Sequence, residues 1–388
     1  MRSLLTIFVI FASLMAAVVR AEKPLRPKQT AVIEEFPLPN SYFPFDAEVW
    51  QHKEEMLDGI EGNLVFLASS HGLDAYKRFA EVGISQARVE QSLERFRELL
   101  MRASSQNDFA EGLKREFVLF RSAGRDGMGT VRFTGYFQPV YEASRERTKS
   151  FQYPIFGKHD KFEQWAKPHP TRVQLEGYDG RGSPTSPVKG IEIAWLRTRY
   201  EVFMMQLQGS AILHATDGTQ MAIGFAAGTD YRFRGISKEF LQRNKVSWSK
   251  LQPFFEKHPE SLNEVMSQNN RFVFFRENPD PLPLGSLGLP VMPERSIATD
   301  KSKLPPGAIG IIRAALPQAT PNGKVEMVSR TRLVLDQDTG SGIKGPGRVD
   351  IFMGTGVEAQ RKANHMLTDG ELYYLLIKHW QEPVAALP

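Results

Sequence analysis

From Phe117 onward, the regular spacing of short apolar runs limits the folds that the chain can adopt. Short runs rich in Val, Phe, Tyr and Ile are cut by Gly, Pro or Asp, about every eight to twelve residues. This spacing is typical of small antiparallel sheets or barrels and not of alternating helices and strands. The strands that it predicts span residues 131–137, 192–196, 203–208, 220–225, 272–276, 308–314 and 331–335.

Two segments predict helices instead. Residues 87–103 place Val89, Leu93 and Phe96 at helical spacing, which indicates a helix with one buried face. Residues 237–268 also predict a helix, with Ser237 as its cap. The stretch 279–290 is rich in Pro, Gly and Leu, so we expect a linker with few structured contacts and a domain boundary near Gly285.

The first 21 residues predict a secretion signal. Arg2 is followed by an apolar run over residues 4–19 and by a small-residue cleavage site at Ala21. That run is shorter than the about 20 residues of a membrane-spanning helix. We therefore expect an exported, soluble protein.

The full length of 388 residues exceeds what one hydrophobic core usually holds, so two domains are expected.

Composition excludes several kinds of chemistry. The chain has no Cys, which removes disulfides, a thiol nucleophile and a lipid-modified cysteine, so no lipid anchor is expected. Its eight His residues are scattered and lack the spacing of a zinc site, so neither a metal nor another cofactor is expected. The net charge of +5 mostly reports solubility and does not indicate a nucleic-acid partner.

Residues 337–352 concentrate the groups most suited to catalysis. This segment contains Asp338, Lys344 and Asp350 among several glycines. Asp350 lies in a strand-like run, where Asp is depleted, so its carboxylate must be paired, hydrated in a cleft or functional. Asp338 is either functional or a turn residue that binds backbone amides. Lys344 binds an anionic sugar substituent, stabilises a neighbouring carboxylate or is a solvated turn lysine.

The sequence Asp-Thr-Gly-Ser at residues 338–341 matches the local pattern of aspartic proteases. Those enzymes need two such aspartates that share one proton. The chain has one copy, which excludes a single-chain aspartic protease.

Two other segments offer groups for binding sugar. Tyr136 lies in an aromatic, Pro-containing run over residues 133–140, where it either stacks on a sugar ring or packs in the core. Gln208, Gly209 and Ser210 end the predicted strand over 203–208. Their amide and hydroxyl groups suit the hydroxyl and acetamido groups of a sugar, although a solvated strand end explains them equally well.

Taken together, these motifs resemble the membrane-bound lytic murein transglycosylase A (MltA) family, including its C-terminal 3D domain, which is named for three aspartates. The resemblance is carried in order by residues 134–139, 171–177, 206–210, 272–276, 285–290, 295–300 and 338–354.

The resemblance implies a mainly β fold with N-terminal helices. A double-psi β-barrel domain would comprise residues 22–143 and 283–388, and a second, smaller β-barrel, residues 144–282, would interrupt it. A groove between the two would hold a glycan strand. The three aspartates would be Asp300, Asp338 and Asp350, with Asp350 as the catalytic acid and the other two in support.

The implied activity is cleavage of the β-1,4 bond between N-acetylmuramic acid and N-acetylglucosamine, with formation of 1,6-anhydromuramyl ends. Asp350 would act first as the acid and then as the base. One alternative is a hydrolase that uses both Asp350 and Asp338. Another is a non-catalytic protein that binds the cell wall. The expected partners are peptidoglycan strands and, as candidates, wall-synthesis proteins, and the expected location is the periplasm.

Overall fold

The computed structural model describes residues 34–37, 46–79 and 84–380, so the predicted signal segment lies outside the described residues. The fold is mainly β, with two sheets and helices that precede the first barrel in sequence, which confirms the predicted fold class.

Within the described residues, the first sheet has the strand order β1-β2-β14-β11-β12-β10-β13-β3. Strand β3 also pairs with β14, so the strands from β14 through β3 close into a six-stranded barrel and β2 and β1 extend from its side. Two of the pairings are parallel, β10 with β12 and β13 with β3. The strands are β1 (Glu34–Pro37), β2 (Phe117–Arg121), β3 (Val131–Gln138), β10 (Ser296–Ala298), β11 (Ile309–Ala319), β12 (Val325–Asp338), β13 (Arg348–Thr355) and β14 (Leu367–Ile377).

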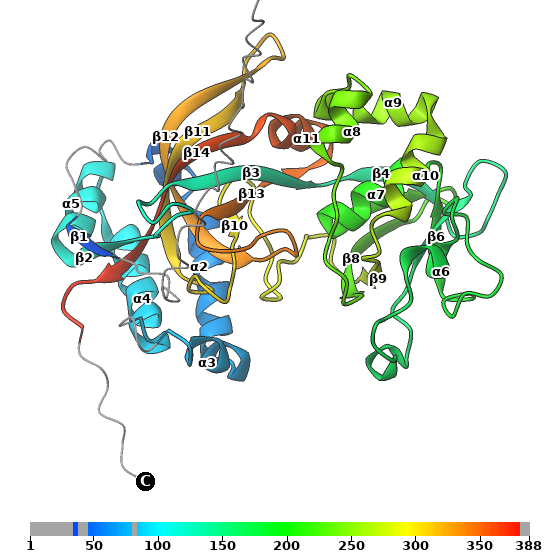
Figure 1. Cartoon of the computed structure of the whole chain (residues 1–388). Coiled ribbons are helices and arrows are strands. Elements are labelled where there is room, and N and C mark those ends of the chain that lie inside the picture. The colour runs from blue at the N-terminus through cyan, green and yellow to red at the C-terminus, as the bar shows by residue number, and fades with distance from the viewer. Residues whose placement is uncertain (1–33, 38–45, 80–83, 381–388) are drawn as a thin grey trace, which may run out of the picture. The chain divides into compact units, whose positions relative to one another are not determined.

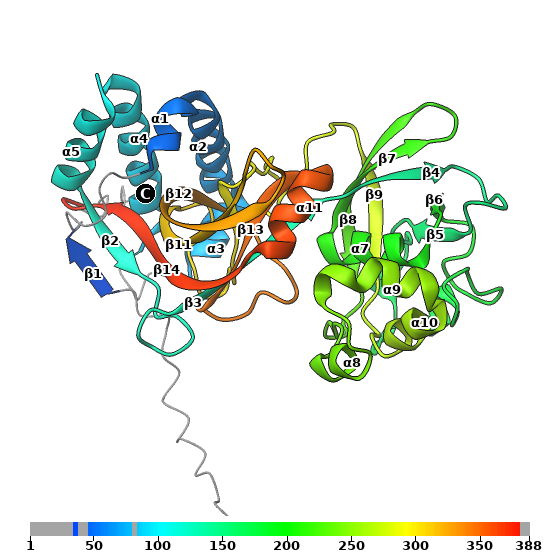
Figure 2. The same ribbon diagram turned by 90° about the horizontal axis from the view of Figure 1, so that it is seen from above.

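Helices from the N-terminal part of the chain pack against this barrel (Figure 2). The predicted helix over 87–103 is confirmed as α4: the Ser85 side chain caps it, and Val89, Leu93 and Phe96 are buried in the hydrophobic core that the helix shares with the barrel strands. The helices that accompany this barrel are α1 (Ala47–Gln51), α2 (Lys53–Ala68), α3 (Ser70–Tyr76), α4 (Gln86–Arg102), α5 (Gln106–Glu116) and α11 (Gly356–His365).

The second sheet is inserted in the first, because the chain leaves the barrel after β3 and returns to it at β10 (Figure 1). Its order is β5-β6-β4-β7-β8-β9, and a bridge between Gly157 and Phe275 brings the end of β5 to β9, so the sheet curls toward closure. The domain limits near residues 143 and 283 stay a prediction. The strands are β4 (Val140–Ser144), β5 (Tyr153–Phe156), β6 (Glu192–Leu196), β7 (Ser210–Ala215), β8 (Gln220–Gly228) and β9 (Val273–Asn278).

The prediction of a strand over 203–208 is wrong, because these residues end the helix α7 (Arg199–Gln208). Thr198 and Glu201 form a capping box that fixes the start of this helix. The run from Val202 to Met205 is buried throughout, and a short apolar run of this kind fits a buried helix as well as a strand. Gly209, at φ 84°, ends the helix in the left-handed conformation.

The prediction of one helix over 237–268 is correct in type but not in continuity. Ser237 does cap a helix, but that helix ends at Arg243, and Lys245, two residues later, has a positive φ of 51°. Pro259 then begins a new helix, a position where its missing N–H costs nothing. The helices of the inserted part are η3 (Phe162–Gln164), α6 (Arg172–Glu176), α7, α8 (Lys238–Arg243), η4 (Trp248–Lys250), α9 (Leu251–Lys257) and α10 (Pro259–Ser267).

A buried charge network stabilises the inserted part. Glu176 accepts from Arg172 at 3.3 Å and from Arg199 at 2.6 Å, and all three side chains are buried. We predict that Glu176→Gln lowers the free energy of unfolding by about 3–5 kcal/mol, because it leaves two buried guanidinium groups without a counter-charge. Urea denaturation measures this change.

The matched control is Glu142→Gln, which breaks the exposed ion pair with Arg197. Its expected cost is at most about 1 kcal/mol. Equal effects of the two substitutions would show that burial does not set the value of the Glu176 network.

Candidate active site

The barrel places Asp338 and Asp350 on either side of one residue. Ala298 of β10 pairs with Asp338 of β12 and with Asp350 of β13. Adjacent strands lie about 4.8 Å apart and direct cross-strand partners point to the same face, so the two Cα atoms are roughly 10 Å apart with both carboxylates on one face. Residues separated by many positions in the sequence thus meet at the shortest strand of the barrel.

Asp350 lies on β13, which confirms its predicted position in a strand, and its environment is largely buried. Its side chain is 20% exposed, the Thr134 hydroxyl donates to Oδ1, and Arg348 Nη2 lies 3.2 Å from the same oxygen. Burial raises the pKa of Asp350 to about 6, against the opposing effect of Arg348 and with a further rise from the charge of Asp338. The carboxyl can therefore hold a proton near neutral pH.

Asp338 is held in place by three hydrogen-bond donors. The Tyr136 hydroxyl donates to Oδ2 at 2.8 Å, and the backbone N–H groups of Ser286 and Thr339 donate to Oδ1 at 2.8 and 2.7 Å. Burial raises the pKa of Asp338, while these donors act in the opposite direction. The turn-type contact with backbone amides that the sequence left open for Asp338 is therefore present, and the residue also lines the cavity.

Asp300 binds a different part of the structure from Asp338 and Asp350. It is buried, and its carboxylate accepts from the backbone and hydroxyl of Ser302 and, at 2.7 Å, from the backbone N–H of Gly345. Burial disfavours its charged form, but the hydrogen bonds from Ser302 and Gly345 outweigh this effect and lower the pKa of Asp300. The carboxylate thereby fixes the loop that carries Lys344.

A cavity of about 1000 Å³ lies beside Asp338, and a smaller one of about 190 Å³ is lined by Asp350. The two share Gln206, Leu207 and Ser341 among their lining residues, so they form parts of one groove. Every residue that the sequence proposed for binding lines the larger cavity, namely Tyr136, Gln208, Gly209, Ser210 and Lys344. Asp300 is absent from both linings.

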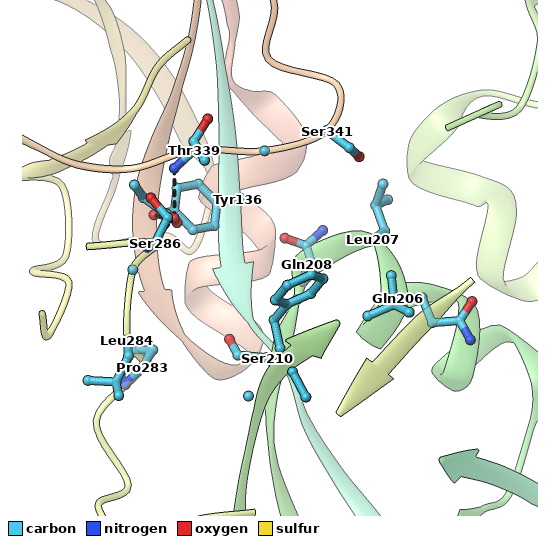
Figure 3. Close-up of a pocket in the computed structure, with 18 of the residues that line it drawn as sticks. Tyr136, Gln206, Leu207, Gln208, Ser210, Pro283, Leu284, Ser286, Thr339 and Ser341 are labelled. Atoms are coloured by element: carbon cyan, nitrogen blue, oxygen red, sulfur yellow. Dashed lines mark hydrogen bonds between the residues drawn. The ribbon is translucent and has the colours of Figure 1, made fainter. Parts of the chain in front are cut away.

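The groove-lining residues after α7 are arranged by the end of that helix. The Oε1 atom of Gln208 accepts from the backbone N–H of Phe137 at 3.0 Å, so its NH₂ group remains to donate. Figure 3 shows Gln206, Gln208 and Ser210 around the α7–β7 junction, while Tyr136, Ser286 and Thr339 lie close together. The polar groups that the sequence placed at a strand end therefore lie at a helix end, and they still line the cavity.

The stretch 279–290 was wrongly predicted to have few structured contacts. It forms a bridge between Leu284 and Pro290, lines the cavity and donates the Ser286 N–H to Asp338. Gly285 permits this approach, because a Cβ atom there would lie 2.6 Å from the carbonyl oxygen of Gln337.

Sequence reasoning also missed Arg348 and Thr134. Arg348 is two positions before Asp350, and alternation along a strand puts both side chains on one face, so this signal was available. Thr134 is the cross-strand partner of Asp350 through a pairing between β3 and β13 that no local pattern reveals.

The described residues contain neither a metal-binding cluster nor a membrane-spanning helix. In the ranges 34–37, 46–79 and 84–380, no three His, Cys, Asp or Glu side chains are grouped as they would be around a metal ion. Over the same described ranges, no helix has both the length and the apolar character needed to cross a membrane.

A carboxyl that can hold a proton near neutral pH, beside a groove lined by amides, hydroxyls and an aromatic ring, suits an enzyme that protonates a sugar oxygen. The profile of the MltA specific insert domain matches residues 132–276, and that of the 3D domain matches residues 295–376. The chain belongs to the membrane-bound lytic murein transglycosylase A family.

Individual relatives support this assignment. Membrane-bound lytic murein transglycosylase A of Escherichia coli K12 is 31% identical over 259 residues, which are 65% of this chain and 67% of the relative. The Vibrio cholerae protein of the same name is 29% identical over 259 residues, with the same coverage.

Solved structures share the fold. The crystal structure of E. coli MltA with bound chitohexaose has a TM-score of 0.67 at 24% identity and covers 90% of this chain and 96% of its own. The crystal structure of a membrane-bound lytic murein transglycosylase from Agrobacterium tumefaciens also has a TM-score of 0.67, at 23% identity. It covers 89% of this chain and 98% of its own.

The raised pKa of Asp350 predicts a stability change with a definite sign. Since its pKa rises from 3.8 to about 6 on folding, folding is destabilised as pH increases between these values, by about 3 kcal/mol above pH 6. We predict that Asp350→Asn raises the melting temperature at pH 7.5 and that this gain disappears at pH 4. Thermal unfolding at the two pH values measures it.

Asp217→Asn is the matched control, because Asp217 is half-exposed and the Thr219 hydroxyl and backbone lower the pKa of its carboxyl. This substitution should give no gain at pH 7.5. A melting temperature of Asp350→Asn equal to or below that of the wild type at pH 7.5 would contradict the burial cost.

Proposed function

We propose that this protein is a peptidoglycan lytic transglycosylase that cleaves the β-1,4 bond between N-acetylmuramic acid and N-acetylglucosamine and leaves 1,6-anhydromuramyl ends. The observation that best supports this proposal is that Asp350, which lines the groove, has a largely buried carboxyl with a pKa of about 6. The relatives are named lytic murein transglycosylases, and the E. coli structure is described with bound chitohexaose, a sugar chain. The reaction requires no cofactor.

In the proposed mechanism, protonated Asp350 donates to the glycosidic oxygen while positive charge develops at the muramyl C1. The bond from C1 to that oxygen breaks, and N-acetylglucosamine leaves with the proton. The Asp350 carboxylate then takes the proton of the muramyl C6 hydroxyl, whose oxygen closes on C1. The carboxyl is thereby restored, and one acid/base is sufficient because no water is activated.

Asp338 supports this cycle through its charge and its fixed position. Its negative charge favours the protonated form of Asp350. Donors from Tyr136, Ser286 and Thr339 occupy its oxygens, which makes it a poor base for activating water. Asp300 has a positioning role, because it holds the backbone of Gly345 beside Lys344.

The remaining proposed residues bind the glycan strand. The NH₂ group of Gln208 and the hydroxyl of Ser210 are available to sugar hydroxyl and acetamido groups at the cavity. Tyr136 donates its hydroxyl to Asp338, so its ring is fixed where it lines the same cavity. Gly209 lines the same cavity, and the space beside it is open, since nothing lies within 4 Å of the position of a Cβ atom there.

The cellular setting that fits this function is the periplasm, where peptidoglycan lies in bacteria with two membranes. Peptidoglycan strands are then the substrate, and wall-synthesis proteins are candidate partners. The signal segment over residues 1–21 stays a prediction.

The products test the mechanism. We predict that wild-type protein releases muropeptides with 1,6-anhydro ends from purified peptidoglycan, and that Asp350→Asn reduces the rate by about 10²–10⁴-fold because the acid is lost. Mass spectrometry of the released fragments measures both, since hydrolysis would give products heavier by one water.

Controls separate this proposal from its alternatives. Asp217→Asn, which removes an exposed acid away from the groove, should leave the rate unchanged. Reducing muramic ends without anhydro ends would show a hydrolase that uses two carboxylates. Unchanged release in Asp350→Asn would mean that Asp350 is not the acid, and no release by wild-type protein, with glycan binding retained, would indicate a wall-binding protein.

The pH dependence reports the proton on Asp350. Because the protonated form is active, kcat/KM should fall as pH rises through about 6. Arg348 favours the charged form of Asp350, so Arg348→Gln should raise the pKa of Asp350 and shift the fall in kcat/KM to higher pH. Arg348→Lys keeps the charge and should shift this fall less. If kcat/KM falls at the same pH in the wild type and in Arg348→Gln, Asp350 is not the group whose titration causes the fall.

A further inference from the structure

The larger cavity carries an excess of positive charge. Four cations line it, Arg232, Arg271, Arg276 and Lys344, against the two acids Asp230 and Asp338. Across the described ranges, none of these four cations forms an ion pair, whereas buried guanidinium groups elsewhere in the fold, such as that of Arg295 with Asp46, are paired. The cavity therefore has more cations than acids in its lining, and its four cations have no salt bridge within the described residues.

The guanidinium of Arg271 is partly buried and hydrogen-bonded to neutral acceptors. Its Nη1 atom donates to the carbonyl oxygens of Thr229 at 2.8 Å and Tyr231 at 3.5 Å, both neutral acceptors. Burial lowers the pKa of the Arg271 guanidinium, a sign that this charge is partly desolvated without compensation. A partly buried charge is costly unless an opposite charge accompanies it, and in the part of the chain that the structure describes no group forms a salt bridge with Arg271.

The surrounding residues fix Arg271 in place. The buried Arg172 side chain donates to the carbonyl oxygens of Arg271 and, at 2.8 Å, of Asn269, and Glu176 in turn pairs with Arg172. Gly228 makes room for the guanidinium, because a Cβ atom there would lie 2.7 Å from Arg271 Nη2. An arginine supported by buried residues in this way is preorganised for a ligand.

Arg276 provides a second oriented guanidinium on β9. Its Nε atom donates to Asn278 Oδ1 at 3.1 Å, and this contact leaves its terminal nitrogens to other acceptors. Gly224, its cross-strand partner on β8, lines the cavity with it. Phe225 follows on β8, is 45% exposed and lines the cavity, so an apolar ring lies on the strand that pairs with β9.

We propose that Arg271 and Arg276 form a binding site for carboxylate groups carried by the glycan strand. This proposal rests on the proposed function, because it concerns the substrate of the same groove. Guanidinium groups bind carboxylates through paired hydrogen bonds that neutral sugars do not match. In peptidoglycan, such carboxylates come from the lactyl group of each muramic acid and from the attached peptide stem.

Binding in the Asp350→Asn background tests this site without cleavage. Three probes of equal sugar length distinguish the sources of charge: chitohexaose, which is neutral, a glycan hexasaccharide that keeps only its lactyl carboxylates, and the same hexasaccharide with peptide stems. We expect the carboxylate-bearing probes to bind about tenfold more tightly than chitohexaose in isothermal titration calorimetry, which measures each Kd.

Adding Arg271→Gln or Arg276→Gln should weaken binding of the carboxylate-bearing probes about tenfold and change chitohexaose binding less than about twofold. Arg271→Lys should retain part of the preference. Arg276 is exposed, so its variant tests the site even where Arg271→Gln folds poorly. The matched control is Arg243→Gln, which removes an exposed arginine of α8 that does not line the cavity.

The probes also locate the source of the carboxylate. A preference that appears with the lactyl hexasaccharide assigns the site to the sugar itself, and one that appears only with stems assigns it to the peptide. Equal affinity for all three probes, or an equal loss for all three in the arginine variants, would overturn the proposal. Anhydro products without charge preference would refute this site alone, and charge preference without anhydro products would refute the reaction alone.

Discussion

The position of strand β3 is the constraint on which barrel and site both depend. Thr134 pairs with Asp350 of β13 on one side and with Leu367 of β14 on the other, so the barrel closes at this residue. Alternation along the strand puts Thr134 and Tyr136 on one face, where their hydroxyls bind Asp350 and Asp338. Only Pro139 then separates β3 from β4, the first strand of the inserted sheet. One strand therefore closes the barrel, contacts both carboxylates and leads into the insertion.

The two carboxylates show how similar groups acquire different chemistry from their surroundings. Both are largely buried, and burial raises the pKa of each. Asp338 compensates through three donors with fixed geometry, two of them backbone N–H groups. Asp350 has one hydroxyl donor and one ion pair, with Arg348, on the same oxygen Oδ1, so Oδ2 has no protein partner among the described residues. An oxygen without a protein partner is the one that can carry and transfer a proton.

Local sequence patterns were sufficient for features that depend on neighbouring residues. The helix α4 followed from its apolar spacing, and the strand character around Asp350 followed from Val349 and Ile351. Patterns failed where burial on all sides removes periodicity, as in α7, whose capping box at Thr198 and Glu201 was the decisive signal. The pairing of β10 between β12 and β13 depends on residues far apart in the chain, so the meeting of Asp338 and Asp350 at Ala298 had no local signature. The same applies to Ser286, whose N–H reaches Asp338 from a stretch that resembled a linker.

The division of residues between the sheets also separates chemistry from selectivity. Asp338, Asp350 and their direct partners Thr134 and Tyr136 belong to strands of the closed barrel. Arg271 and Arg276 lie beside or on β9 in the inserted sheet, where Arg172 and Glu176 support the first of them from a buried network. Substitutions in the inserted sheet can therefore alter which strand substituents bind while Arg348 and Asp338, the charged groups that act on the pKa of Asp350, stay in place. For that reason, the arginine variants should change substrate affinity while the pH at which activity declines stays that of the wild type.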